Sequence, residues 1–514
     1  MIRLGILLVI VLASIASPVR SEPVANISLF NAKTTVSVYT AALAFIAPRN
    51  LEGASIPQLT IWGLHGLSAL DPDLRADVVQ GKLQLAFGTQ TIFSIDAPKF
   101  DDPAGWGQAA ALLTEAGWKV SRPLQRAGTQ GIIEIFFREL FAHLDPYSRY
   151  VSPMEAAADE AQRWGRAGIG ITVRRRGNSI VVEAVSPDSP GSDAGVRAGD
   201  WVLAVDGQRA TGQPASLVSA WLAGPEGSPV RLSWRTDAKS IRAAELTREL
   251  VPPETVFPHF HKRSLLLQVT GFNGNTEVRF AADIQRAMAS ARPPDGIVVD
   301  LRGNRGGLLA EAVGVADELL PEGIVATTDG RDPAANRIWR SASGELAKGI
   351  PIIVLVDGNT ASAAEVLAAA LADRGRAVVV GSSTTGKGLV QTFIALPDGG
   401  ELFVTWSRVL APRGWPLQGL GILPQVCTSL GQEELDRQLS ALAEGEQPME
   451  AALARARSAR APVPAAELVE IRAACPAAVG EAGDTDAAQY LLRNPAAYAA
   501  ALLPPIGAPV AAGP

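Results

Sequence analysis

Two residues whose side chains could carry out acyl transfer, Ser362 and Lys387, each follow a short apolar run. Ser362 comes after the run 352–356, and Lys387 lies in the loop GSSTTGKG, residues 381–388, after the run 377–380. A serine hydroxyl becomes a nucleophile when a base takes its proton, and a lysine can be that base if burial keeps its amine neutral. The pair therefore predicts a Ser-Lys site, a variant of the catalytic triad that needs no histidine.

Backbone amides near these residues could complete such a site. A tetrahedral intermediate needs two amide donors for its oxyanion. Ala363 is at the predicted start of a helix, and Gly306 and Gly307 follow the apolar run 297–301. The amides of Ala363 and of the glycine pair are therefore the expected oxyanion hole.

Each part also has a simpler interpretation. Ser362 and Glu365 form the pattern S-x-x-E of a helix capping box, Lys387 could be a solvated surface charge, and the glycine pair could be a tight turn. The loop GSSTTGKG matches the spacing of a phosphate-binding loop, but Gly388 stands where the magnesium-binding Ser or Thr is needed. A strand is predicted at 389–394, where a phosphate-binding loop needs a helix, so nucleotide binding is disfavoured.

The elements around these residues alternate between apolar strands and helices. Strands are predicted at 297–301, 352–356 and 377–380, and helices at 308–320 and 362–373. This alternation is typical of a mostly parallel α/β sheet with both faces covered, here assigned to residues 255–430. Loops at the carboxyl ends of such strands gather at one edge, which would bring the serine, the lysine and the glycine pair together.

A β-rich module is predicted at residues 160–250. Strands are expected at 168–173, 179–185, 201–207 and 229–234, with a helix at 215–222. Its motifs GIGI at 168–171, AGVRAGD at 194–200 and VDG at 205–207 resemble a PDZ domain. The resemblance implies that Gly168, Ile169 and Gly170 bind a peptide's terminal carboxylate, and that Leu217, Val218 and Trp221 line the side-chain pocket. A purely structural β-domain is the alternative.

Three further segments complete the organisation. The uncharged run 4–19 after Arg3 is typical of a signal peptide covering residues 1–21, and is too short and too interrupted for a membrane anchor. Residues 22–155 form a mostly helical region, in which Pro72 and Pro146 are expected to end helices. Residues 431–514 form a tail rich in Ala and Pro, expected as helical pieces with flexible joints that are tied to the core if Cys427 and Cys475 pair.

Composition and charge narrow the function further. The 514 residues are 47% hydrophobic and 19% charged, which is ordinary globular composition, and removal of residues 1–21 would change the net charge from −6 to −8. An acidic chain disfavours nucleic acid as a partner. The four histidines lack metal-ligand spacing, so neither a metal nor another cofactor is expected. Cys427 and Cys475 could be a disulfide or two buried thiols, and an oxidising compartment favours the disulfide.

The ordered motifs from about residue 130 to 426 resemble the C-terminal processing peptidases, which are PDZ-containing serine peptidases of the tail-specific type. They are LDPYSRY at 144–150, DLRGNRGG at 300–307, TASAAE at 360–365, TGKGLVQ at 385–391, LPDG at 396–399 and GLGILP at 419–424. The family implies a crotonase-like protease core with the PDZ domain inserted. It also implies Ser362 as nucleophile, Lys387 as general base and Gln391 as the residue that orients the lysine. A straight strand would place Gln391 about 13 Å from Lys387, so a direct contact needs a kink, expected at Gly388.

The resemblance implies an exported serine endopeptidase, periplasmic or extracellular, that cleaves polypeptides near their free C-termini. Membrane association, an adaptor protein and a homo-oligomer are left open by the sequence. The alternative is a PDZ scaffold with a vestigial catalytic site, because Arg305 stands where the family usually has proline before the two glycines.

Overall fold

The computed structural model describes residues 29–505 except 238–239, 343 and 481, so the predicted signal peptide lies outside the described residues. The chain divides into two compact units. One holds the described residues up to Thr40 together with Thr60–Leu140, and the other holds Ala41–Leu59 and the residues from Phe141 onward. Within the described ranges, no helix has the length and apolar character needed to cross a bilayer.

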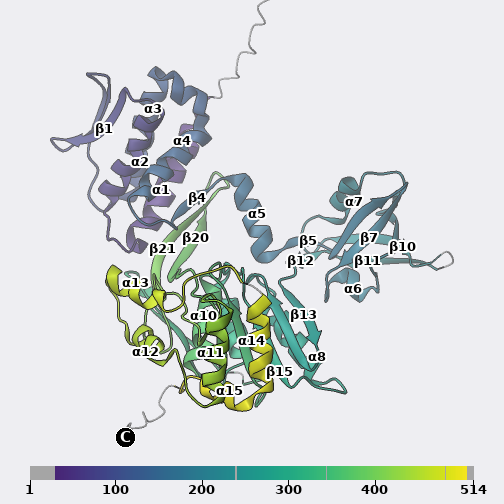
Figure 1. Cartoon of the computed structure of the whole chain (residues 1–514). Coiled ribbons are helices and arrows are strands. Elements are labelled where there is room, and N and C mark those ends of the chain that lie inside the picture. The colour runs from purple at the N-terminus through teal and green to yellow at the C-terminus, as the bar shows by residue number, and fades with distance from the viewer. Residues whose placement is uncertain (1–28, 238–239, 343, 481, 506–514) are drawn as a thin grey trace, which may run out of the picture. The chain divides into compact units, whose positions relative to one another are not determined.

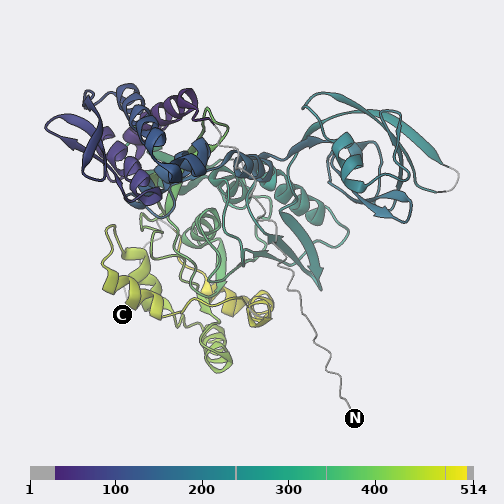
Figure 2. The same ribbon diagram turned by 90° about the horizontal axis from the view of Figure 1, so that it is seen from above.

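The N-terminal elements are helical with one small sheet. They are α1 Ala32–Arg49, α2 Ile56–Leu70, β1 Leu74–Val79, β2 Lys82–Phe87, β3 Gln90–Asp96, α3 Pro103–Val120 and α4 Arg122–Ala142. The helices α2 and α4 end shortly before Pro72 and Pro146, as the sequence predicted. The three strands form an antiparallel sheet that packs on α3 (Figure 2), and the sequence analysis did not predict this sheet.

A second module is built mainly of short antiparallel strands. Its elements are β5 Arg166–Gly168, β6 Ile171–Arg176, β7 Ser179–Val185, α6 Pro190–Asp193, β8 Trp201–Val205, β9 Gln208–Arg209, α7 Ala215–Leu222, β10 Pro229–Arg235, β11 Ile241–Thr247 and β12 Glu249–Val251. The sheet order is β11-β10-β8-β7-β6, and α7 covers its apolar core. The helix α7 coincides with the predicted range.

The largest core is built on a six-stranded sheet with the order β13-β14-β15-β18-β19-β22. Its strands are β13 Val256–His261, β14 Ser264–Val269, β15 Gly296–Asp300, β18 Ile352–Val356, β19 Ala377–Gly381 and β22 Val426–Cys427. The pairs from β14 to β22 are parallel, and only β13 runs antiparallel. The continuous apolar runs make β15, β18 and β19 buried along their whole length.

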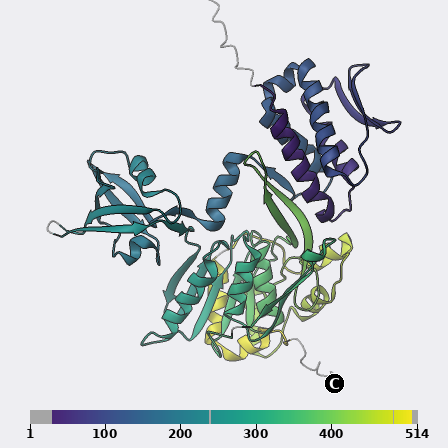
Figure 3. The same cartoon turned by 180° about the vertical axis from the view of Figure 1, so that it is seen from behind.

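Helices cover both faces of this sheet (Figures 1 and 3). One face packs on α8 Thr276–Met288, α9 Leu309–Asp317 and α10 Ala363–Asp373. The other packs on α11 Gln432–Ala443, α14 Ala482–Arg493 and α15 Pro495–Ala501. The tail also contains α12 Glu450–Ser458 and α13 Ala465–Ala473. The sequence analysis expected loosely jointed helices here, but the tail supplies the second helical layer of the core.

A second sheet stands beside the loops that follow β18 and β19. It has the order β17-β16-β21-β20, from β16 Gly323–Asp329, β17 Arg337–Ser341, β20 Leu389–Ala395 and β21 Glu401–Leu410. The short strand β4 Arg149–Val151, which precedes α5 Pro153–Trp164, pairs with β21. Residues 145–149 are thereby brought to the edge at which β15, β18 and β19 end.

Candidate active site

Ser362 occupies an unusual backbone conformation at the start of α10. Its φ is 58° and its ψ is −121°, a region that residues other than glycine rarely adopt. Such a conformation persists only where the surroundings impose it, and it is found most often at functional sites. The loop before it is tightly fixed, because the Asp357 carboxylate accepts the N–H groups of Asn359 and Thr360 and the Ala361 N–H donates to the Asn304 carbonyl at 2.9 Å.

Glu365 connects the serine to the lysine loop. Its side chain is fully buried. Its Oε2 accepts the Ser362 N–H at 2.7 Å and the Lys387 N–H at 2.9 Å, while Oε1 accepts the Gly386 N–H at 2.6 Å and the Thr384 hydroxyl. Burial raises the pKa of Glu365, and these four donors oppose that rise by stabilising the carboxylate. One buried carboxylate therefore holds the backbones of Ser362 and Lys387 side by side.

The Lys387 side chain lies in a surrounding that favours its neutral form. Burial lowers the pKa of Lys387, the positive charge of Arg149 lowers it further, and Glu365 and Asp145 oppose these effects. Its Nζ lies 4.9 Å from the centroid of the Tyr147 ring. Among the described residues, Nζ forms no hydrogen bond or ion pair, so it is not hydrogen-bonded to Ser362 Oγ in this structure.

Ser362 and Lys387 line the same cavity, which has a volume of about 340 Å³. Its apolar lining residues include Leu308, Leu309, Val366, Leu389, Val390, Phe393, Phe403 and Val409. Charged and polar groups at the same cavity are Arg149, Asp159, Gln162, Arg163, Arg305 and Gln391. The cavity therefore presents both apolar and charged surface next to Ser362.

The glycine loop approaches Ser362 too closely for any side chain. A Cβ on Gly306 would lie 2.9 Å from the Ser362 Cβ and 3.0 Å from the Ala363 nitrogen, and a Cβ on Gly307 would lie 2.1 Å from the Phe272 carbonyl oxygen. The Gly306 amide already donates to Asn304 Oδ1 at 2.8 Å. In the described part of the chain, the amides of Gly307 and Ala363 have no acceptor, so of the predicted donors these two are free to bind an oxyanion.

Gln391 forms no hydrogen bond with Lys387 within the described residues. Its Nε2 donates to the Leu389 carbonyl and to Thr405 Oγ1, both at 3.1 Å. The irregularity in β20 is a bulge between Val390 and Gln391, where the register with β21 shifts, and not the expected kink at Gly388. Gly388 is required for a different reason, because a Cβ there would lie 2.2 Å from the Gln418 nitrogen.

Comparisons with known proteins identify related families and relatives. Residues 263–428 match the peptidase family S41, and residues 181–236 match the PDZ domain. The chain is 33% identical over 305 residues to a carboxy-terminal-processing protease of Bartonella bacilliformis, with 58% of this chain and 69% of that protein covered. It is also 33% identical over 345 residues to a chloroplastic C-terminal processing peptidase of Tetradesmus obliquus, with 62% and 72% covered.

The chain belongs to the C-terminal processing peptidase family. The resemblance seen in the sequence is thereby confirmed. A solved photosystem II D1 C-terminal processing protease is 26% identical, with 74% of this chain and 97% of that chain covered and a TM-score of 0.36.

The PDZ domain of this family member has a groove beside α7. The groove is lined by residues 166–172, Ser186, Ser219, Leu222 and Ala223, and also by residues of α5 and by residues 251–253. The carbonyls of Ile169 and Gly170 accept the N–H groups of Gly191 and Ser186. Within the described ranges, the amides of Ile169 and Gly170 have no acceptor, which leaves two donors for a terminal carboxylate.

The α7 residues predicted for the groove do not line it. Val218 is fully buried in the domain core, Trp221 packs against that core, and Leu217 is 40% exposed. The side chain of Ile169 is buried as well, so only its backbone is available to a peptide. Of the three predicted residues, Val218 and Trp221 thus face the domain core, and the α7 residues that line the groove are Ser219 and Leu222.

Cys427 and Cys475 form a disulfide with their sulfur atoms 2.07 Å apart. It joins the last strand of the sheet to the segment that precedes α14. No group of three or more His, Cys, Asp and Glu side chains in the described structure is placed to hold a metal ion.

Sequence reasoning missed several residues around the lysine. Asp145 accepts the N–H groups of Tyr147 and Ser148 at 2.9 Å, and the Thr405 hydroxyl donates to it at 2.7 Å. This turn places Tyr147 over Lys387. The motif LDPYSRY marked the segment as part of the family pattern, but no local signal indicated that it would lie beside the lysine.

Proposed function

We propose that this serine-type endopeptidase of the C-terminal processing family acts through a dyad of Ser362 and Lys387. The observation that carries the proposal is that Glu365 Oε2 accepts the N–H groups of both residues while their side chains line one cavity. The backbone conformation of Ser362 and the lowered pKa of Lys387 support the same assignment.

In this mechanism the neutral amine of Lys387 takes the proton of Ser362 Oγ as the oxygen attacks the scissile carbonyl. The amides of Ala363 and Gly307 stabilise the oxyanion. The protonated lysine then gives its proton to the leaving amine, and a water molecule activated by the same lysine hydrolyses the acyl-enzyme. Catalytic hydrogen bonds often shorten only when substrate is bound, so contact between Lys387 Nζ and Ser362 Oγ is expected as substrate fills the cavity.

Gln391 acts indirectly in this proposal. Through Thr405 it is linked to Asp145, whose turn places Tyr147 over the lysine. Gln391 is therefore a positioning residue.

We further propose that the core is crotonase-like and that the protein works after export, in the periplasm or outside the cell. The PDZ domain binds the terminal carboxylate of a polypeptide with the amides of Ile169 and Gly170, while the side chain nearest that terminus contacts Leu222 and Ala223.

The dyad is tested with the chain lacking residues 1–21, an unstructured polypeptide as substrate, and the variants Ser362→Ala and Lys387→Ala. Loss of cleavage and of fluorophosphonate labelling in Ser362→Ala, with loss of cleavage in Lys387→Ala, is expected. Lys387→Arg is also expected to be inactive, because a guanidinium stays protonated and cannot accept a proton. If the wild type and all variants fail to cleave the substrate, the alternative of a scaffold with a vestigial site is favoured. An active Lys387→Arg variant would show that another group is the general base.

Capture by the PDZ domain is tested with two peptides of one sequence, one with a free carboxyl terminus and one amidated. Amidation removes the charge that the free amides bind, so KM is expected to rise roughly tenfold while kcat changes little. Equal KM values for the two peptides would contradict recognition of the carboxylate.

A further inference from the structure

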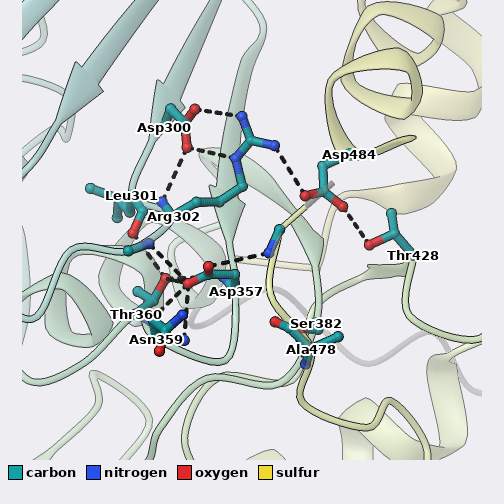
Figure 4. Close-up of polar contacts among 12 residues, drawn as sticks. Asp300, Leu301, Arg302, Asp357, Asn359, Thr360, Ser382, Thr428, Ala478 and Asp484 are labelled. Carbon is teal, nitrogen blue, oxygen red and sulfur yellow. Dashed lines mark hydrogen bonds and ion pairs between the residues drawn. The ribbon is translucent and has the colours of Figure 1, made fainter. Parts of the chain in front are cut away.

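A short piece of the tail contacts both loops that carry the proposed dyad. We name residues 475–480 the clamp segment. The Ala478 carbonyl accepts the Gly358 N–H at 2.7 Å, in the loop that carries Ser362. The same carbonyl accepts the Ser382 hydroxyl at 2.9 Å, in the loop that carries Lys387, and Figure 4 shows Ala478 beside Ser382. The Ala478 N–H lies 3.0 Å from the same Ser382 oxygen. One residue of the tail thus bridges the two loops.

Asp357 extends this connection to the loop that holds the glycine pair. Its Oδ1 accepts the N–H groups of Gly303, Asn359 and Thr360 at 2.9 to 3.0 Å, and its Oδ2 accepts the Gly480 N–H at 3.3 Å (Figure 4). Asp357 is 3% exposed. Because buried hydrogen-bonding groups are costly to leave unpaired, the carboxylate ties the clamp segment firmly to the start of the nucleophile loop.

Asp484 anchors the end of the same stretch of tail. It is 2% exposed, accepts the Thr428 hydroxyl at 2.6 Å, and pairs with Arg302 at 3.1 Å (Figure 4). Arg302 in turn forms two hydrogen bonds to Asp300 at the end of β15. A Cβ on Gly480 would lie 2.5 Å from Arg302 Cδ, so the clamp segment lies directly against this arginine.

The disulfide fixes the beginning of the clamp segment. Cys475 is joined to Cys427, and Cys427 pairs with Gly381, the last residue of β19. Residues from 429 onward lie outside the segment that matches the peptidase family. The clamp segment lies in this part of the chain.

We propose that the clamp segment is a positioning element that holds Ser362 and Lys387 in register, and that the Cys427–Cys475 disulfide makes this alignment depend on redox conditions. The inference rests on the proposed dyad. A dithiol would break the S–S bond by a two-electron reduction that leaves two thiols on the protein, while the dithiol itself becomes a disulfide. The freed segment would then no longer hold Gly358 and Ser382 at a fixed separation.

The first test compares Ser382→Ala with Tyr498→Phe. Ser382→Ala removes the hydroxyl that bonds Ala478. Tyr498 belongs to the same tail, but its hydroxyl accepts the N–H of Ile352 at 3.0 Å. Ile352 is the first residue of β18, whereas Gly358 follows the last residue of that strand. Ser382→Ala is expected to lower kcat roughly tenfold or more with KM changed less than about twofold, because small displacements of reacting groups have large effects on rate. Tyr498→Phe is expected to keep kcat at a similar or lower Tm.

The second test uses the wild type with and without an added dithiol, and the double variant Cys427→Ser with Cys475→Ser. The reduced wild type and the double variant are expected to share a lowered kcat, and the double variant is expected to be insensitive to the dithiol. Peptide binding by the PDZ domain should be unchanged in both, since that domain does not contain the disulfide. Near-UV circular dichroism at the assay temperature checks that the fold is retained.

The possible results separate the inference from the proposed function. Failure of the dyad would appear as a wild type no more active than Ser362→Ala. With an active wild type, an unchanged kcat in Ser382→Ala would overturn the positioning role, as would equal losses in Ser382→Ala and Tyr498→Phe. An unchanged kcat after reduction, or loss of the near-UV signal on reduction, would overturn the redox dependence.

Discussion

At the scale of single residues, the pKa of Lys387 is affected by a charge that the sequence pattern did not identify. Arg149 lies at the same cavity, and its positive charge disfavours the protonated lysine. The guanidinium is half exposed, with Asp159 at 3.6 Å and the Phe403 ring beneath it at 4.2 Å. Its effect on the lysine is therefore partly screened by solvent and salt.

Removal of this charge is expected to move the pH dependence of activity. In the proposed mechanism only the neutral lysine is active, so activity rises as pH rises through its pKa. Arg149→Gln should raise that pKa, shift the rise in kcat/KM to higher pH and lower activity at neutral pH, most strongly at low salt. Arg149→Lys keeps the charge and should keep the wild-type profile. Superimposable profiles for wild type and Arg149→Gln would contradict the electrostatic role.

Some residue assignments could not have come from the sequence. The Ser-Lys pair was indicated by chemistry and spacing, but the partner of Gln391 is set by the bulge in β20, which depends on how β21 pairs with it. The groove side of α7 was misplaced for a similar reason. Val218 and Trp221 are apolar residues of that helix, but they pack in the domain core and do not line the groove.

At the scale of elements, the hairpin of β20 and β21 connects the catalytic cavity to the segment around β4. The Thr405 hydroxyl is central to this connection, because it accepts a hydrogen bond from Gln391 and donates one to Asp145. The backbone N–H of Thr405 donates to Ser148 Oγ at 2.9 Å. The hairpin therefore positions the ring of Tyr147 over the lysine.

Thr405→Val should test this connection. The change keeps the shape of the side chain but leaves buried partners without the hydroxyl, which is expected to cost about 1–3 kcal/mol in the free energy of unfolding. We also expect kcat to fall more than KM changes, since Tyr147 loses its fixed position. The matched control is Thr392→Val on β20, where the threonine forms no side-chain hydrogen bond within the described residues. A kcat equal to wild type in Thr405→Val would exclude the hairpin from positioning the lysine.

The elements that were predicted well have strong local signals. The apolar runs of β15, β18 and β19 are buried throughout, and their order along the chain was sufficient to expect that the three loops meet. The sheet of β1 to β3 and the pairing of β4 with β21 have no comparable signal. The contact between residues 149–151 and 401–403 joins parts of the chain that are far apart in sequence.

At the scale of the whole molecule, the tail is part of the core. The side chains of Val298, Ile353 and Val380 on one face of the sheet are covered by α11, α14 and α15. The alanine-rich composition of the tail suggested loose joints, because small side chains give a weak amphipathic pattern. In the folded structure the tail helices pack against the sheet, and this packing fixes their positions.

Leu491→Ala measures how much this layer stabilises the fold. Leu491 is fully buried on α14, so its truncation is expected to lower the free energy of unfolding by about 2–5 kcal/mol in urea titrations. Val469→Ala on α13 is the control, because Val469 is 69% exposed and should change stability by less than about 0.5 kcal/mol. Similar small effects of both changes would mean that the tail layer contributes little to stability.

The helix that begins after Ser362 limits how this protein can change. All 11 residues from Ala363 to Asp373 are buried, and the carboxylate at its end is bonded by Arg413, Trp415 and Arg457. A larger side chain at a core-facing position of α10 would overpack the core and displace Ser362. Variation that alters which peptides are cut is therefore expected in the residues that line the cavity, which on α10 are Ala363 and Val366, and the rest of the helix is expected to vary little.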